Sequence, residues 1–283
     1  MQTDPGCYTY SNSSRPGQGF RITRTSGPPV HAILTSSYTT ASVNFVTWNK
    51  AYSIFPRQTL IDHYFAPLKP LDDGFGTHLK ELVCQGWTAR DIRWPDLDGA
   101  KARQLCGFRR VGDDSTLLVP LNTDSVEVPP TPDFVIEYTQ FKVKWNSMQA
   151  GHGHVLFARQ PNQGVFGQNQ NTLQPEYSRL EILADELTSQ ALRHSYITAS
   201  ENWKNYLTDR LKRWVWLELY KIAPLNRPIQ PLHVTPLITD ASIPHNFELP
   251  KSWDYADDQI PKWFRELDQL GVSEEGPQVL LRR

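Results

Sequence analysis

Proline most strongly limits where this chain can form regular structure. Of its 22 prolines, three lie in the stretch Pro129-Pro130-Thr131-Pro132, and six more interrupt residues 224–250. Proline has no backbone N–H and a fixed φ angle, so it is disfavoured inside helices and central strands. We therefore interpret 129–132 as a stiff connector. Residues 224–250 are interpreted as an extended segment that wraps the domain or a neighbour.

The charge and composition of the chain exclude several classes of protein. Lys and Arg total 29 while Asp and Glu total 30, so the net charge of −1 provides no global attraction for nucleic acid or anionic lipid. No run approaches the roughly 18 consecutive apolar residues that span a bilayer, and the first ten residues lack the features of a secretory signal. The three cysteines, Cys7, Cys84 and Cys106, are too scattered for a disulfide framework. We expect a soluble protein in the reducing cytoplasm.

The first two thirds of the chain are rich in strand-forming residues. Residues 31–55 carry many Val, Ile, Thr, Tyr and Phe side chains and are predicted to form two strands. The segments 108–111 and 116–121 are predicted to pair as a hairpin around Gly112-Asp113-Asp114-Ser115. A longer strand is predicted over 134–145, where the apolar pattern shifts at Thr139–Gln140 and indicates a bulge.

Helix signals dominate the last third. Capping-box patterns at Ser178–Glu181 and Thr198–Glu201 predict helices to about residues 194 and 222. Shorter helices are predicted over 58–65, over 77–85 with Gly86 at the C-terminus, and from Pro261 to Gly271. Strands followed by helices indicate an α+β fold. We expect an antiparallel sheet from the N-terminal two thirds, packed by two C-terminal helices and followed by an arm rich in Pro and Trp.

The composition also suggests three regions. Residues 1–29 are rich in Gly, Pro and Ser and are predicted to be a flexible tail. Residues 30–222 are expected to form a single α+β domain, and 223–283 an extended arm with a short terminal helix. The Gln/Asn-rich loop Gln160–Gln174 has no predicted role.

No familiar catalytic motif occurs in the sequence, but a histidine pair is a candidate site. Phosphate-binding loops, dinucleotide-binding glycine patterns, nucleophile elbows and His-Glu-x-x-His are all missing. His152 and His154 stand two residues apart, so in a strand both imidazoles would lie on one face and could bind one metal ion. A polar turn with surface histidines is the simpler interpretation. We expect no cofactor.

Two charged stretches are candidate binding sites. Arg109 and Arg110 lie close to Asp113 and Asp114, and an arginine there could clamp a phosphate or a sugar. A solvated hairpin tip is the alternative. Residues 210–216 contain Arg210, Lys212 and Arg213 beside tryptophans, a pattern that can bind nucleic acid. A helix with one solvent-exposed basic face and one buried aromatic face explains the same pattern.

The sequence favours a non-enzymatic protein-binding or assembly subunit. Its tail and its long arm are typical of segments that clasp a neighbouring chain, so we expect a protein partner or self-association. Trp253, Trp263 and Phe264 are the predicted anchors of the arm, either on a partner or folded back on their own chain. The alternatives are an enzyme that uses His152 and His154, and a nucleic-acid-binding protein that uses residues 210–216. The sequence does not indicate a small-molecule ligand.

Overall fold

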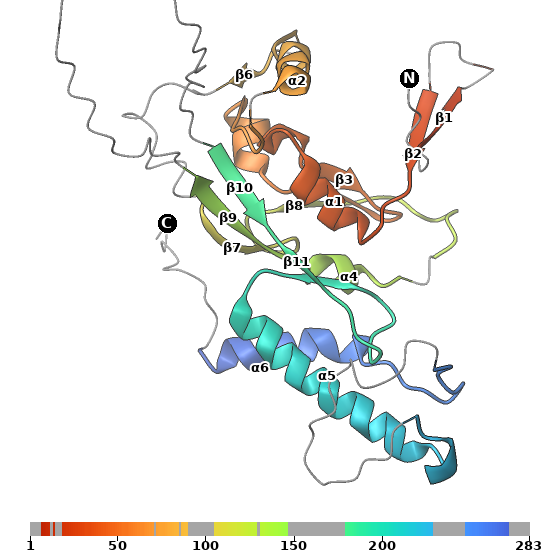
Figure 1. Cartoon of the computed structure of the whole chain (residues 1–283). Helices are drawn as coiled ribbons and strands as arrows, with labels where there is room; N and C mark the ends of the chain where they lie inside the picture. Colours follow the sequence, from red (N-terminus) through yellow and green to blue (C-terminus); the bar gives the residue numbers. More distant parts are fainter. Residues whose placement is uncertain are drawn as a thin grey trace, which may run out of the picture.

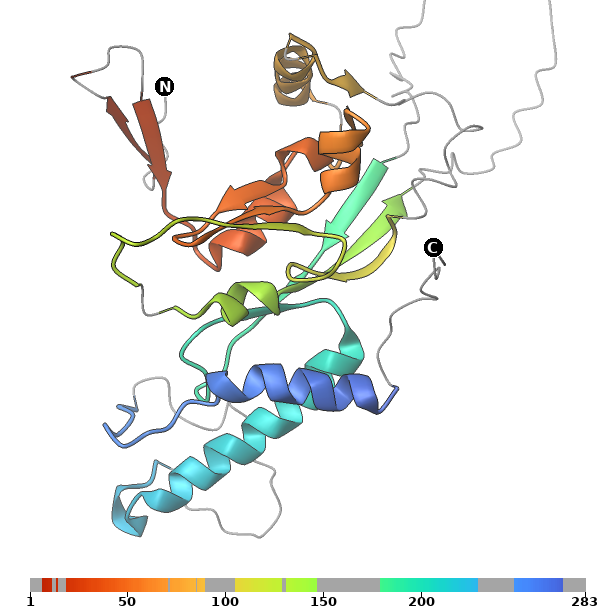
Figure 2. The same cartoon turned by 180° about the vertical axis from the view of Figure 1, so that it is seen from behind.

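Small, mostly antiparallel sheets and several helices make up this α+β protein, shown from opposite sides in Figures 1 and 2. The computed structural model describes residues 7–11, 14, 19–70, 72–84, 86–89, 105–128, 131–146, 179–228 and 247–271. Within these residues the strands are distributed over several small sheets rather than one large sheet. No helix in these ranges combines the length and apolar character needed to cross a bilayer.

A three-stranded sheet lies at the centre of the molecule. Its strands are β7 (Gly107–Arg110), β9 (Gln140–Asn146) and β10 (Arg179–Leu183), all antiparallel in the order β10-β9-β7. One face is apolar because alternate residues such as Phe141, Val143 and Leu180 are buried. Helix α1 (Pro29–Ser36) adds Val30 and Leu34 to the same hydrophobic cluster.

A second three-stranded sheet packs on the same cluster. It consists of β3 (Asn44–Val46), β4 (Lys50–Ser53) and β8 (Leu117–Pro120), in the order β3-β4-β8. Tyr52 is buried in the cluster, with partly buried Phe45 and Leu118 against it. An ion-pair group joins this sheet to α4 (Asp133–Glu137), since Lys50 Nζ lies 2.8 Å from Asp133 Oδ2 and 2.6 Å from Glu137 Oε1.

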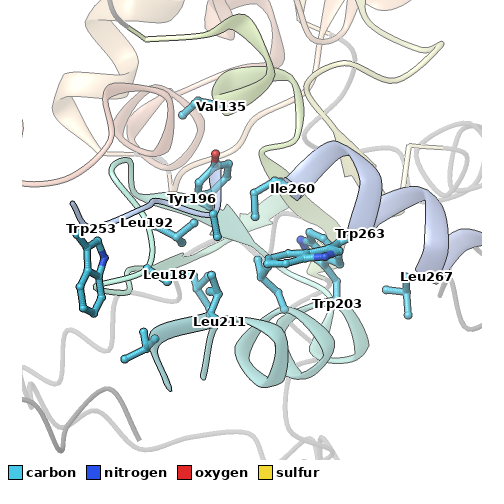
Figure 3. Packing of buried hydrophobic residues seen from close by; sticks show 14 of the residues in the cluster. Val135, Leu187, Leu192, Tyr196, Trp203, Leu211, Trp253, Ile260, Trp263 and Leu267 are labelled. Atoms are coloured by element: carbon cyan, nitrogen blue, oxygen red, sulfur yellow. The ribbon is translucent and has the colours of Figure 1, made fainter. Parts of the chain in front are cut away.

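Two helices form the opposite layer, at the bottom of Figure 1. Helix α5 (Glu201–Lys221) and helix α6 (Ile260–Gln269) enclose a second hydrophobic cluster. Figure 3 shows Trp203 and Trp263 between the two helices. The hydroxyl of Ser200 accepts a hydrogen bond from the Trp203 N–H and caps α5. Gly271, with φ +65°, follows α6 in a backbone conformation that L side chains rarely adopt.

The remaining elements are short. Helix α2 (Asp73–Cys84) is followed by Gly86 at φ +85°. Two-residue strands β5 (Tyr64–Phe65) and β6 (Thr88–Ala89) pair in parallel, and β11 (Asp185–Leu187) pairs with β12 (Tyr196–Thr198). Single turns occupy η1 (Thr40–Ser42), η2 (Arg57–Ile61), η3 (Pro224–Asn226) and η5 (Asp257–Gln259). Strands β1 (Cys7–Ser11) and β2 (Gly19–Thr23) form a hairpin within the segment expected to be a tail.

The structure corrects five local predictions. The helix predicted over 58–65 is reduced to the single turn η2, and Tyr64–Phe65 form strand β5. Residues 29–36 are helix α1, not a strand, and 178–194 contain β10 and β11 rather than a helix. The segments 107–110 and 117–120 do not pair as a hairpin, because β7 pairs with β9 while β8 pairs with β4. The predicted strand 134–145 is split into α4 and β9, so the pattern shift at Thr139–Gln140 marks a helix–strand boundary and not a bulge. The predicted helices over 77–85, 198–222 and 261–271 are confirmed by α2, α5 and α6.

Candidate interaction surfaces

The predicted anchor tryptophans fold back on their own chain. Trp253 and Trp263 are only 6% and 5% exposed and belong to the cluster between α5 and α6. The indole N–H of Trp253 donates to the carbonyl of Gln190 at 3.1 Å. Trp263 packs edge-to-face against Trp214 of α5, with ring centroids 6.1 Å apart (Figure 3 labels Trp253 and Trp263). Both side chains are therefore part of the intramolecular core.

A buried carboxylate fixes the arm at its middle. Asp257 is 7% exposed, and its oxygens accept hydrogen bonds from the Arg193 N–H at 2.8 Å, the His194 N–H at 3.2 Å and the Tyr196 hydroxyl at 3.2 Å. Burial and the adjacent carboxylate raise the pKa of Tyr196 above its usual range. Since Asp257 has three donors in the chain, it is a structural anchor.

A second carboxylate fixes the beginning of the described arm. Glu218 of α5 is 4% exposed and accepts hydrogen bonds from Lys221 Nζ at 2.6 Å and from the Asp254 N–H at 3.1 Å. Lys221 also pairs with the Asp254 carboxylate at 2.8 Å. The arm is thus held at two points by charged groups that are paired within the chain.

Arg109 supports a turn and is not available as a ligand clamp. Its Nε and one terminal nitrogen donate to the two oxygens of Asp113, both at 2.9 Å, and its other terminal nitrogen donates to the Ile54 carbonyl at 2.9 Å. The guanidinium also lies 5.4 Å from the ring centroid of Phe55. Burial alone would raise the pKa of Asp113, but the hydrogen bonds and charge of Arg109 outweigh it and hold that pKa below its usual value.

Arg110 and Phe264 are the two predicted site residues that the structure brings into contact. The guanidinium of Arg110 lies 4.7 Å from the ring centroid of Phe264 and 4.9 Å from that of Tyr138. The adjoining cavity of about 60 Å³ is lined partly by Gln140 and Trp203. That volume suits one or a few water molecules. These cation–π contacts join β7 to α6 and to Tyr138, the residue that follows α4.

The structure does not test the predicted histidine site. His152 and His154 lie outside the described residues, as does the loop Gln160–Gln174. Among the residues that are described, no three His, Cys, Asp or Glu side chains are grouped as a metal site.

In α5, Arg210 pairs with Glu266 at 3.0 Å, and Trp214 donates to the Asp254 carbonyl at 2.8 Å. These two side chains therefore serve packing between α5 and the arm.

The hairpin β1–β2 exposes an apolar face that sequence reasoning did not identify. Tyr8 stands opposite Ile22 in the antiparallel register, and Tyr10 lies two residues from Tyr8, so the three share one side of the hairpin. They are 57%, 51% and 47% exposed in the order Tyr8, Ile22, Tyr10. We call these three residues the hairpin face. The alternation Cys-Tyr-Thr-Tyr-Ser in residues 7–11 is the strand signal that could have revealed it.

The hairpin projects from the body of the protein, as both views show (Figures 1 and 2). It is joined to α1 by only five residues, 24–28, and the hydroxyl of Thr25 donates to the Gly27 carbonyl at 2.7 Å. A Cβ atom at Gly27 would lie 2.7 Å from Glu186 Oε2, so the linker runs close against β11. The root of the hairpin is therefore held while its strands extend outward.

A second exposed apolar surface runs along strand β8 and continues into the residues after it. Five apolar side chains in the twelve-residue segment 117–128 are between 39% and 69% exposed: Leu117, Val119, Leu121, Val126 and Val128. Asp124 and Glu127 lie among them and are also exposed. We call these seven residues the β8 strip. Exposed apolar side chains concentrated in one segment indicate an interaction surface more strongly than scattered ones do.

Comparisons with protein-family models, with curated proteins and with solved structures found no match to this chain, so the interpretation of these surfaces depends on their geometry and chemistry.

Proposed function

We propose that this protein is a non-enzymatic assembly subunit that associates through its N-terminal hairpin. The observation that carries the proposal is the exposed hairpin face of Tyr8, Tyr10 and Ile22 on an element that projects from the body. A two-stranded hairpin is marginally stable in water and gains stability when one face is covered. A covering neighbour therefore supplies a physical reason for an ordered hairpin at this position.

The composition of the hairpin supports the same conclusion. Its opposite face carries Cys7, Thr9 and Thr23, and the Thr23 hydroxyl lies 3.8 Å from Cys7 Sγ. One side is thus aromatic and aliphatic, while the other carries small polar residues and, at the position opposite Thr9, Arg21. Tyrosine is enriched in protein interfaces, because its ring buries apolar area while its hydroxyl still finds a polar partner. The C-terminal arm has a different role in this proposal, which is to complete the core of its own chain.

Sedimentation velocity over a range of concentrations tests the proposed function. The wild-type chain should associate as its concentration rises, and the double variant Tyr8→Ser/Ile22→Ser should stay folded but associate at least tenfold more weakly. Leu225→Ser is the control, since Leu225 is 94% exposed in η3, just after α5, and should not affect association. A wild-type chain that stays monomeric, or a double variant that associates like the wild type, would refute the proposal.

A further inference from the structure

The charges of the chain are segregated in a way that the net charge conceals. Residues 5–61 contain five basic residues and no Asp or Glu: Arg15, Arg21, Arg24, Lys50 and Arg57. Residues 111–140 contain six acidic residues and no Lys or Arg: Asp113, Asp114, Asp124, Glu127, Asp133 and Glu137. The first segment includes the hairpin, and the second includes the β8 strip.

Pairing within the chain leaves only part of this acidic segment neutralised. Asp113 is bound by Arg109, while Asp133 and Glu137 are bound by Lys50. Asp124 and Glu127 are exposed, and no ion pair is found for either of them among the described residues. The β8 strip therefore combines exposed apolar side chains with two unpaired negative charges.

The hairpin has the complementary properties. Its apolar face is followed directly by the exposed and basic Arg24, whereas Arg21 pairs with Thr9 and holds a position of the other face. Complementary charges around an apolar contact steer association and fix its orientation. We propose that the hairpin face of one copy of this chain docks on the β8 strip of a second copy, an inference that rests on the proposed function and specifies its partner.

The arrangement of the two surfaces favours reciprocal pairing. The hairpin and the segment after β8 leave the body on the same side, to the right in Figure 1 and to the left in Figure 2. A two-fold axis beside that side lets each copy donate its hairpin and receive the other. One hairpin face of three side chains buries at most several hundred Å². Two symmetric contacts bring the total toward the roughly 1,200 Å² or more that stable interfaces bury.

A mixing experiment tests this pairing separately from the proposed function. The hairpin variant is Tyr8→Ser/Ile22→Ser, and the strip variant is Asp124→Arg/Glu127→Arg. Each alone should weaken dimerisation at least tenfold in sedimentation velocity. The hairpin variant loses apolar contacts, and the reversed charges at positions 124 and 127 repel Arg24. Circular dichroism melts confirm that both variants are folded. Glu248→Arg, which reverses an exposed carboxylate of the arm, is the control and should dimerise like the wild type.

The two variants should then complement each other. An equimolar mixture of ¹⁵N-labelled hairpin variant and unlabelled strip variant retains one intact contact, in which the strip variant's hairpin docks on the hairpin variant's strip. Native mass spectrometry should show the mixed dimer in excess of both homodimers. If the strip variant dimerises like the wild type, or the mixed dimer is no more abundant than the two homodimers, the β8 strip is not the receiving surface, although hairpin-dependent association can still hold. If the wild type is monomeric, both proposals fail.

Discussion

Asp257→Ala should destabilise the protein markedly, because this carboxylate joins the arm to the loop before β12. The substitution leaves three donors without their acceptor, namely the N–H groups of Arg193 and His194 and the hydroxyl of Tyr196. Each unsatisfied buried donor costs about 1–3 kcal/mol. Part of that cost is offset because a carboxylate no longer has to be desolvated, a penalty of several kcal/mol. A net loss of about 3 kcal/mol in the free energy of unfolding is expected.

Thermal unfolding followed by circular dichroism measures this effect. A loss of about 3 kcal/mol lowers the melting temperature by roughly 6–12 °C in a protein of this size. Asp258→Ala is the matched control, because Asp258 is the exposed neighbour of Asp257 and its removal should change stability by less than about 0.5 kcal/mol. If Asp257→Ala melts at the same temperature as Asp258→Ala, the arm is not anchored as described and the assignment of Trp253 to the intramolecular core is wrong.

Three further predictions follow from the packing and the charges. Trp263→Ala should lower the free energy of unfolding, measured by urea denaturation, by about 3–5 kcal/mol because it opens a cavity between α5 and α6. Leu270→Ala, at an exposed position, should lower it little. Equal urea midpoints for the two variants would contradict this packing. The pKa of Asp113 is lowered in the folded state, so its contribution to stability is complete above its ordinary value of 3.8 and is lost as the pH falls below it. Asp113→Asn should therefore differ most from the wild type in stability at neutral pH, and a difference that does not shrink on acidification would refute the pairing with Arg109. Burial raises the pKa of Tyr52 to about 12 in the folded state, so above about pH 10 the unfolded chain ionises first and is favoured. The stability of the wild type should therefore fall between about pH 10 and 12 more steeply than that of Tyr52→Phe. Identical slopes would contradict the burial of the phenol.

The sequence predicts the C-terminal helices well because several local signals agree there. Around α5, the cap is Ser200 within the Thr198–Glu201 pattern, while Thr198 itself ends β12. The apolar positions Leu207 and Leu211 repeat at helical spacing. Pro261 in the first turn and Gly271 after the last turn mark the limits of α6 in the same way. Where capping, periodicity and termination signals agree, the local preference and the tertiary contacts favour the same helix.

The errors occur where two local patterns compete. Around Ser178–Glu181 the sequence fits a capping box, yet Leu180 and Ile182 also alternate as strand residues do. Pairing with β9, which places Glu181 opposite Lys144 and buries both apolar side chains, selects the strand. In α1, Thr35 and Ser37 donate their hydroxyl protons to carbonyls four residues earlier, which satisfies polar groups that would otherwise disfavour this helix. Such choices depend on partners distant in sequence.

The candidate surfaces were only partly predictable for a related reason. The aromatic character of Trp253, Trp263 and Phe264 predicts that they anchor the arm. Whether they pack on their own chain depends on Asp257 and Glu218, whose hydrogen-bond partners are distant in sequence. The exposed face of the hairpin depends on its register, in which Tyr8 meets Ile22 across a turn. The β8 strip becomes visible only when β8 is known to be the edge of its sheet.

Hydrogen–deuterium exchange at several protein concentrations tests the central claim most directly. Because an uncovered two-stranded hairpin opens readily, its backbone amides in residues 7–11 and 19–23 should exchange fast in dilute protein. If two copies pair through the hairpin face and the β8 strip, protection of these amides rises with concentration, together with that of residues 117–128, while amides inside α5 are unaffected. Exchange in the hairpin that is independent of concentration, over the range in which the account expects association, would contradict the assembly role.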